Sequence, residues 1–363
     1  MFDSVEIDTL SYEYEKTILC HYCRSSHVQR RGTRRGKEKF YCSSCTHWFQ
    51  VNRSHDRVSG AQLSLLHLDG ISFRTLADEF SLSVGTVYHR VFHYLQQLPH
   101  CADISRTYCV RYSGIVITDG KYVRIKGYDR KIPVLYGIDY ATHDIPTYYL
   151  APSENYQACI QYFGSLKLLN YPLQAMVCDE NINIFEACRF VYPGAITQLC
   201  QNHYKENIRL SLDLAHNPKY HSFMHGIEEL FVRKRSPDDF NKRGKTLFNQ
   251  YKQDPLCTSI LIDIYRQQEL LCAWRKGTGI PTTTNLIECF NSHLQDRLKA
   301  LQGFESKEHA DLWLNAYFIR RRTKRFSGCT GKFKHLNGYN SLQKSKKLDL
   351  DLPLYFNQKR DRF

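Results

Sequence analysis

Hydrophobic positions between residues 59 and 97 recur at helical spacing in three short blocks. Gly70 separates the first block from the second, and Ser72 and Ser83 can cap the second and third helices. The pattern therefore predicts three helices with a tight turn before the third. The blocks are Leu63 and Leu66; Phe73, Leu76, Ala77 and Phe80; and Val84, Val87, Val91 and Leu95.

The third predicted helix has an inner and an outer face. If Val87 and Val91 point into the core, then Thr86, His89 and Arg90 point outward on the leading half of the helix. A helix-turn-helix places this half in the major groove, so we expect these three residues to read bases. A three-helix segment can instead serve only packing or dimerisation.

Residues 105–204 alternate between strand and helix signals. Strands are expected over 115–117, 122–125, 134–138 and 147–150, with Asp119-Gly120 as a turn pair. A helix over 155–168, a strand over 174–178, a helix over 182–190 and a strand over 195–199 follow. This order predicts an α/β fold with a ribonuclease-H-like core. Asp119 would close the strand over 115–117 and Asp179 the strand over 174–178, so the two carboxylates would meet at one end of the sheet.

A third carboxylate lies far downstream. Residues 205–276 have helical spacing and few strand signals, which predicts an all-helical insertion. Residues 281–288 then lead into another helix, on which Glu288 lies outside the apolar stripe. That stripe consists of Ile287, Phe290, Leu294 and Leu298.

Two pairs of cysteines have the spacing of a zinc ribbon. Eighteen residues separate the Cys20-x2-Cys23 and Cys42-x2-Cys45 turns, so four thiolates can surround one structural Zn²⁺. The hairpin between them is strongly basic, and we expect it to contact phosphates, although a solvated charged hairpin is the alternative. Its candidate contacts are Arg30, Arg31, Arg34 and Arg35.

The amino-acid composition and net charge indicate which kind of molecule the protein binds. The 363 residues, 42% of them hydrophobic, can bury the cores of two or three domains, and the formal charge of +14 favours a polyanion. There is no signal peptide and no apolar run of roughly 18 residues, so we expect a soluble, cytoplasmic, nucleoid-associated protein without a membrane partner. In such a protein the other cysteines are expected as buried thiols.

The three carboxylates suit phosphoryl transfer. Two Mg²⁺ or Mn²⁺ ions about 4 Å apart need hard oxygen ligands while they bridge the scissile phosphate. Asp119, Asp179 and Glu288 are the expected ligands. The alternative for each acid taken alone is a capping or surface role.

The order Asp119-Gly120, Asp179, Cys200-Gln201-Asn202-His203 and Thr284 to Asn291 resembles the Mutator-type superfamily of bacterial insertion-sequence transposases. That superfamily carries Asp, Asp, CxxH and Glu in this order, and the resemblance extends from about residue 110 to 325. It implies a DDE transposase with Asp119, Asp179 and Glu288 as catalytic residues and Cys200 and His203 as active-site accessories. The alternatives for Cys200 and His203 are a hydrogen-bonded pair at the start of a helix and a second zinc site.

The resemblance also implies that Trp274, in the helical insertion, stacks on an unpaired base, although a core position is equally expected for this residue. One departure from the pattern is Glu180, which follows the second acid where the family has a small residue. Glu180 is therefore a rival for the second ligand position. Asp296 is a weaker rival for the third.

A basic segment follows the Glu288 helix. Between Asp311 and Asp349 there are ten lysines and arginines and no acid, interleaved with aromatic residues. We expect Arg320, Arg321 and Arg322 to follow a DNA backbone. A solvated helix face is the alternative.

These elements give a domain plan and a function. The expected domains are a zinc ribbon (1–57), a helix-turn-helix (58–104), a catalytic core in two parts (105–204 and 278–330) around a helical insertion (205–277), and a basic tail (331–363). The expected function is cleavage and strand transfer of double-stranded DNA, both transposon ends and target, by a homodimer or higher oligomer. The alternatives are a transposase-derived DNA-binding regulator without catalysis and, third, a structure-selective nuclease.

Overall fold

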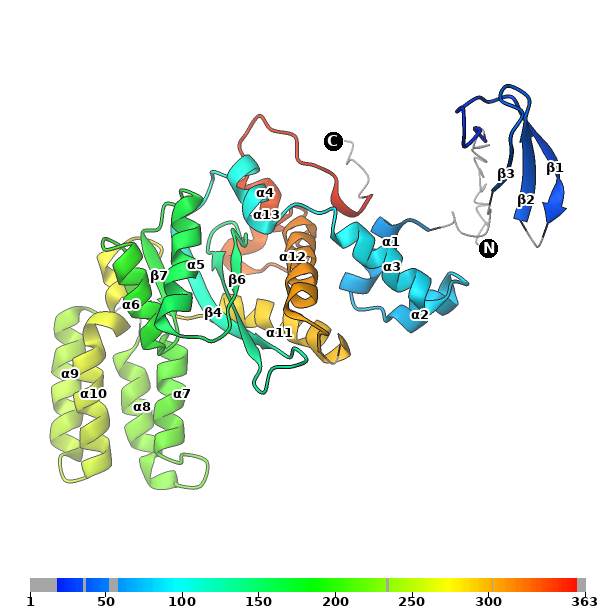
Figure 1. The fold of residues 1–363 in the computed structure, drawn as a ribbon. Coiled ribbons are helices and arrows are strands. Elements are labelled where there is room, and N and C mark those ends of the chain that lie inside the picture. The colour runs from blue at the N-terminus through cyan, green and yellow to red at the C-terminus, as the bar shows by residue number, and fades with distance from the viewer. Residues whose placement is uncertain (1–17, 35–36, 52–57, 233–234, 302, 358–363) are drawn as a thin grey trace, which may run out of the picture.

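The computed structural model describes residues 18–34, 37–51, 58–232, 235–301 and 303–357 (Figure 1). The first of these segments form an antiparallel sheet in the order β1-β2-β3, made of β1 (Val28–Arg34), β2 (Lys37–Cys42) and β3 (Trp48–Val51). Cys20, Phe40, Cys42 and Phe49 form its small buried core. The strand β1 is almost fully exposed along its whole length.

Three helices follow where the apolar spacing predicts them: α1 (Gly60–Leu68), α2 (Phe73–Glu79) and α3 (Val84–Leu95). The hydroxyls of Ser72 and Ser83 accept hydrogen bonds from the first turns of α2 and α3, which confirms both predicted caps. The buried stripe of α3 differs from the predicted one at one position. Val84 is 45% exposed, whereas Phe92 is buried with Val87, Val91 and Leu95.

The three helices are packed against the rest of the chain rather than separate from it. They share one continuous apolar core with the large sheet and with α12 (Lys307–Thr323). His67 of α1 stacks on Phe73 and accepts a hydrogen bond from the indole of Trp313 in α12 at 3.3 Å. A short helix, α4 (Cys101–Tyr108), then precedes the sheet and runs across the expected domain boundary between residues 104 and 105.

The large sheet has the order β6-β5-β4-β7-β8. Its strands are β4 (Ile115–Val123), β5 (Ile132–Asp139), β6 (Tyr148–Leu150), β7 (Ala175–Cys178) and β8 (Ile196–Leu199). The pairs β4–β5 and β5–β6 are antiparallel, and β4–β7 and β7–β8 are parallel.

The predicted turn at Asp119-Gly120 is wrong. Both residues lie inside β4 and pair with Tyr136 and Leu135 of β5. The two expected strands over 115–117 and 122–125 are one strand, because β5 is long enough to pair along its whole length. Asp119 therefore does not close the first strand.

The two faces of the sheet bury different sets of side chains, as alternation along a strand requires. Val116, Leu135 and Met176 belong to the core that contains α5 (Tyr156–Leu168) and α6 (Ile182–Val191). Ile117, Tyr136 and Val177 belong to the core that contains α11 (Asn285–Leu301) and α12. Figure 1 shows α5 and α11 on opposite sides of the strands.

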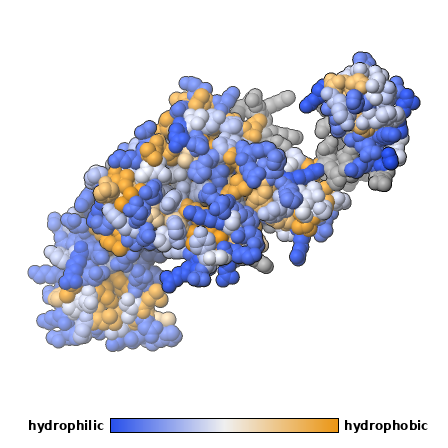
Figure 2. Space-filling view, in the orientation of Figure 1, coloured by the Kyte–Doolittle hydropathy of each residue, from blue (hydrophilic) through white to orange (hydrophobic). Residues whose placement is uncertain are grey.

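The segment over which the sequence predicts helices, residues 205–276, is helical over most of its described residues. The helices are α7 (Gln201–Ser211), α8 (His221–Leu230), α9 (Pro237–Tyr251) and α10 (Pro255–Leu271), with short 3-10 turns η2 (Pro218–Tyr220) and η3 (Ala273–Lys276). In Figure 1 the four long helices project together beyond the sheet. In the space-filling view, hydrophilic residues predominate around the outside of this bundle, with apolar residues between them (Figure 2).

The last described residues fold back onto the core. The elements are η4 (Gly331–Leu336), α13 (Ser341–Ser345) and η5 (Tyr355–Asn357), and they bury Leu336, Leu342 and Phe356. Among the described residues, no helix has the length and apolar character needed to cross a membrane.

Candidate active site

The sheet brings Asp119 and Asp179 to the same edge and the same face. Ile117 of β4 pairs with Val177 of β7, and each aspartate follows two residues later on its own chain segment. Because side chains alternate along a strand, Asp119 shares the face of Ile117, which is covered by α11. The first helical turn of α11 carries Glu288.

Asp119 is held by its own strand and by α11. Its Oδ1 accepts from the Gly120 amide at 2.7 Å, and its Oδ2 accepts from the Asn291 amide group at 2.5 Å. The Tyr136 hydroxyl donates to Asn291 Oδ1 at 2.6 Å and so fixes the orientation of that amide. Burial, and next the charge of Asp179, raise the pKa of Asp119 to about 6.

Asp179, His203 and Glu288 meet around the hydroxyl of Thr284. Asp179 Oδ1 lies 2.6 Å from His203 Nδ1, and His203 Nε2 lies 3.7 Å from Glu288 Oε1. The Thr284 Oγ1 lies 3.2 Å from Asp179 Oδ1 and 2.9 Å from Glu288 Oε1. Burial raises the pKa of Asp179, and the adjacent His203 and Thr284 oppose that rise. The Thr284 hydroxyl thus lies beside Asp179 and His203, which are 105 and 81 residues away from it in the sequence.

Cys200 lies directly behind this cluster. It is the residue before α7, and its Sγ accepts from the Thr284 backbone amide at 3.4 Å. Within the described part of the chain, ligand atoms of Asp179, Cys200 and His203 lie within 4.8 Å of one another, close enough for one metal ion. Asp119, Asp179 and Glu288 do not form so tight a group, and His203 stands between the last two.

Glu154, which the sequence did not single out, is a further carboxylate at this edge. Its Oε1 accepts from Asn181 at 2.8 Å, its Oε2 accepts from the Tyr122 hydroxyl, and its charge adds to the rise in the pKa of Asp119. A Cβ on Gly120 would lie 2.9 Å from the carboxylate, so glycine leaves room for it. Glu154 stands in a loop before α5, where the sequence carries no periodic signal.

The two rival acids point elsewhere. Glu180 is exposed and accepts a hydrogen bond from Asn207 of α7 at 3.3 Å. Asp296 is exposed on α11, two turns beyond Glu288. Neither has a contact with the Thr284 cluster among the described residues.

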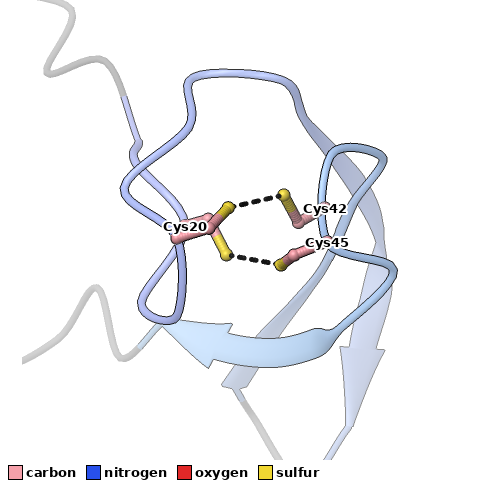
Figure 3. Close-up of side chains that lie close together, drawn as sticks. Cys20, Cys42 and Cys45 are labelled. Carbon is pink, nitrogen blue, oxygen red and sulfur yellow. Dashed lines mark hydrogen bonds between the residues drawn. The ribbon is translucent and has the colours of Figure 1, made fainter.

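The four cysteines of the small sheet converge as their spacing predicts. Cys20 Sγ lies 3.5 Å from Cys45 Sγ, Cys23 Sγ lies 3.6 Å from Cys42 Sγ, and all four sulfurs are within 4.8 Å of one another (Figure 3). Four sulfurs at such separations fit a tetrahedral Zn²⁺. This cluster could hold one zinc ion.

The basic residues of the hairpin differ in what they contact. Arg30 forms an ion pair with Glu38 at 2.7 Å, Arg31 donates to Gln29 at 2.5 Å, and Arg34 is exposed. Arg35 lies outside the described residues. All three described arginines are exposed to solvent. A side chain that contacts a DNA phosphate must be exposed in this way.

The three expected base-reading residues of α3 are placed differently. His89 is exposed, whereas Thr86 is partly buried and its hydroxyl is hydrogen-bonded to Ser83 at 2.8 Å. Arg90 donates to the carbonyl of Val58 at 3.1 Å. His89 is thus the most accessible of the three.

The assignment of Arg322 to DNA is wrong. Its side chain is 1% exposed and forms an ion pair at 2.8 Å with Asp144, which is 0% exposed, so it cannot reach a phosphate. Arg320 is mostly buried against Asp69 at 2.7 Å, and Arg321 lies over the Phe290 ring at 4.6 Å. Because α12 packs on the core, some of its arginines point into the protein. The number of basic residues in the segment does not show which ones do.

Trp274 lies in η3 beside β8 and is half-buried. Its backbone amide donates to Gln198 Oε1 at 2.7 Å, and the Arg275 guanidinium lies 5.4 Å from its ring centroid. The ring packs against the apolar core at one side. A stacking role for it therefore stays a prediction.

No known protein family and no curated protein matches this sequence. Among solved structures, one that is similar is the Drosophila P element transposase strand transfer complex, with 11% sequence identity and a TM-score of 0.44. The match covers 78% of this chain and 95% of that chain. Similarity at this level does not identify a function.

Proposed function

We propose that this chain is a DNA transposase that cleaves DNA at the ends of an insertion sequence and joins those ends to target DNA. The observation that carries the proposal is the position of three carboxylates near one end of the sheet: Asp119 in β4, Asp179 directly after β7 and Glu288 at the start of α11. Asp179 and Glu288 lie on either side of the Thr284 hydroxyl, and the charge of Asp179 contributes to the raised pKa of Asp119. The four-cysteine ribbon and the three-helix segment upstream support DNA as the substrate.

The carboxylates fit divalent cations of the magnesium type. Asp119, Asp179 and Glu288 offer hard oxygen donors. Burial, and next the charge of Asp179, raise the pKa of Asp119, and a bound cation would offset both effects. When bound, Mg²⁺ or Mn²⁺ would neutralise the charge of the scissile phosphate and increase the acidity of the attacking hydroxyl. The four thiolates of the ribbon fit one structural Zn²⁺.

The chain's own residues would hold the acids in place. Asn291, fixed by Tyr136, orients Asp119. The Thr284 hydroxyl lies within hydrogen-bond distance of both Asp179 and Glu288, so its single proton can be donated to either carboxylate. The reaction itself consists of two displacements at phosphorus. Water attacks a phosphodiester, which leaves a 3′-hydroxyl on one side of the break and a 5′-phosphate on the other. That 3′-hydroxyl then attacks a phosphodiester of the target, forms the new phosphodiester and releases a 3′-hydroxyl of the target strand.

The wider assignments belong to the same proposal. The strand order β6-β5-β4-β7-β8, with β5 antiparallel to its neighbours, supports a ribonuclease-H-like catalytic core interrupted by the helices α7 to α10. The Asp, Asp, CxxH, Glu order supports the Mutator-type superfamily. A homodimer or higher oligomer on double-stranded DNA is part of the proposal, because two ends must be joined.

The test is metal-dependent cleavage of DNA that carries the sequences flanking the chain's own gene. With Mg²⁺, Asp119→Ala, Asp179→Ala and Glu288→Ala should each reduce cleavage below detection and leave DNA binding intact. Glu180→Ala and Asp296→Ala are the matched controls and should cleave. A double variant of two ligands should resemble a single one, because one missing ligand already disrupts the shared site.

Three outcomes would contradict the proposal in different ways. Normal cleavage by all three variants would remove the carboxylates from the mechanism. A dead Glu180→Ala with an active Asp179→Ala would move the second ligand by one residue. Sequence-specific binding by wild-type protein with no cleavage at any metal concentration would favour the alternative, a DNA-binding regulator.

A further inference from the structure

A cavity of about 710 Å³ opens on the other side of the segment that carries Glu288. Thr283, Asn285 and Cys289 line it, and these residues flank Thr284 and Glu288 of the catalytic cluster. Ile117, two residues before Asp119 on β4, also lines it. The cavity is therefore adjacent to the carboxylates but does not contain them.

The cationic residues of the lining outnumber its acids. Arg297, Arg320, Arg321, Lys324 and Arg325 line the cavity, and Asp69 is the one carboxylate among the described lining residues. Asp69 is already paired with Arg320 at 2.7 Å and with Lys324 at 3.7 Å. Arg321 has a buried Nε with no hydrogen-bond partner. The arrangement leaves positive charge available for an anion.

Aromatic rings supply the rest of the lining. Tyr140, Phe326 and Phe333 are half-buried, and the Tyr140 and Phe333 ring centroids are 5.3 Å apart. The Arg321 guanidinium lies 4.6 Å from the centroid of Phe290, which also lines the cavity. Flat apolar surfaces beside arginines are the surroundings in which proteins bind unstacked bases.

His143 adds a polar group that lacks a partner. It lines the cavity, its side chain is 5% exposed, and its Nε2 is buried without a hydrogen bond. Rings of Phe333 and Phe326 lie 4.5 Å and 5.6 Å from the histidine ring, and burial lowers the pKa of His143 to about 4. A neutral imidazole in this position can exchange a hydrogen bond with the edge of a base, which a free phosphate would not require.

We propose that this cavity binds one nucleotide of the substrate DNA that has left the base stack. The base would lie among Tyr140, His143 and Phe333, and its phosphate would lie against Arg321 and Arg297. Only the choice of DNA as the source of the nucleotide rests on the proposed function. A free nucleotide carries the same chemistry, so the test must separate the two sources.

The test measures binding of full-length protein to three labelled duplexes, without added divalent metal so that no cleavage step enters. The duplexes are identical except at the centre, where one is fully paired, one has an extra unpaired thymidine and one has an extra abasic residue. Base stacking on aromatic side chains is worth about 1–3 kcal/mol, which converts to a preference of about 5-fold or more. We expect the unpaired thymidine to bind tighter than the abasic residue by that factor.

Variants locate the preference. Phe333→Leu should abolish the ratio between thymidine and abasic duplexes and leave affinity for paired DNA unchanged. Tyr339→Leu is the matched control, because this exposed ring in the same segment is outside the cavity lining, and it should keep the ratio. Arg321→Gln should weaken binding of both extrahelical duplexes alike, since they share the phosphate.

The results separate this inference from the proposed function. Equal affinity of wild type for the thymidine and abasic duplexes overturns the cavity assignment, even if the protein cleaves DNA. Binding of dTMP that depends on Phe333, together with equal affinity for those duplexes, assigns the cavity to a free nucleotide and also overturns it. A ratio that Phe333→Leu abolishes supports the cavity, even in a protein that does not cleave.

Discussion

Arg322 is the cation whose removal should damage the fold most. It is held by Asp144, to which its Nε donates at 2.9 Å and its Nη2 at 2.8 Å, and its Nη1 donates to the Cys101 carbonyl at 2.9 Å. Both charged side chains are essentially inaccessible, at 1% and 0% exposure. Arg322→Met would keep an unbranched apolar stem, shorter than that of arginine, and leave Asp144 as a buried charge without its ion-pair partner.

The expected loss is about 3–5 kcal/mol, because the desolvation cost of Asp144 is no longer offset by its partner. Ser341 and Ser345 still donate to Asp144 at 3.0 and 2.7 Å, which favours the lower part of that range. Arg320→Met, two residues earlier on the same helix, is the control. It should cost no more than about 1 kcal/mol, since Asp69 is 33% exposed and keeps Lys324.

The assay is urea unfolding followed by tryptophan fluorescence. Replacing Trp48 and Trp274 by phenylalanine leaves Trp313, which is buried in α12 and therefore reports on the helix that carries Arg322. The Arg322→Met/Asp144→Leu double variant should lose less than the sum of its single variants, because it removes the stranded charge. A loss below about 1 kcal/mol in Arg322→Met would refute the reasoning.

Three other consequences can be measured directly. Cys42→Ser should reduce bound zinc from about one equivalent to less than about half by metal analysis, without changing the unfolding of the large core. Burial lowers the pKa of His67 from 6.5 to about 4, so the stability that its neutral ring contributes should fall as the pH drops from 6.5 toward 4. Unfolding midpoints should show this fall, and His67→Phe should make it smaller, while His143 still contributes to it. Gly120→Ala should destabilise the core by about 1–3 kcal/mol through contact with Glu154, and adding Glu154→Ala should recover most of the shift in unfolding midpoint.

The sequence predicted correctly those features that depend on residues close together in the chain: helix caps, an apolar helix face and the cysteine cluster. Ser72 and Ser83 cap their helices because a hydroxyl three residues before a free amide needs no tertiary partner. The Glu288 helix buries Ile287, Phe290 and Leu294, as the spacing indicated. The four-cysteine cluster follows equally directly, because two CxxC turns each present their sulfurs to one point.

Predictions that depended on distant partners were less successful. Asp119-Gly120 has the composition of a turn, yet β5 pairs across it, and no local pattern reveals the length of a partner strand. Arg322 belongs to a run of three arginines, but its partner Asp144 is 178 residues away in sequence. The sequence also did not predict the roles of Glu154 and Asn291 in the site. Their contacts exist only once β4, α5 and α11 are assembled.

The helix α12 packs between the three-helix segment and the sheet that carries Asp119. One side of it contacts α1 and α3, with His309 against Phe92 at 4.6 Å and Arg320 against Asp69. Phe318 packs on Tyr136 of the sheet at 5.1 Å, and Tyr136 in turn orients Asn291 and thereby Asp119. If α3 reads bases, as the sequence predicts, this packing sets the distance between the recognised sequence and the carboxylates. Substitutions at the α3–α12 contact, such as His309→Ala, should then shift where the DNA is cut relative to the bound site, rather than only weaken binding.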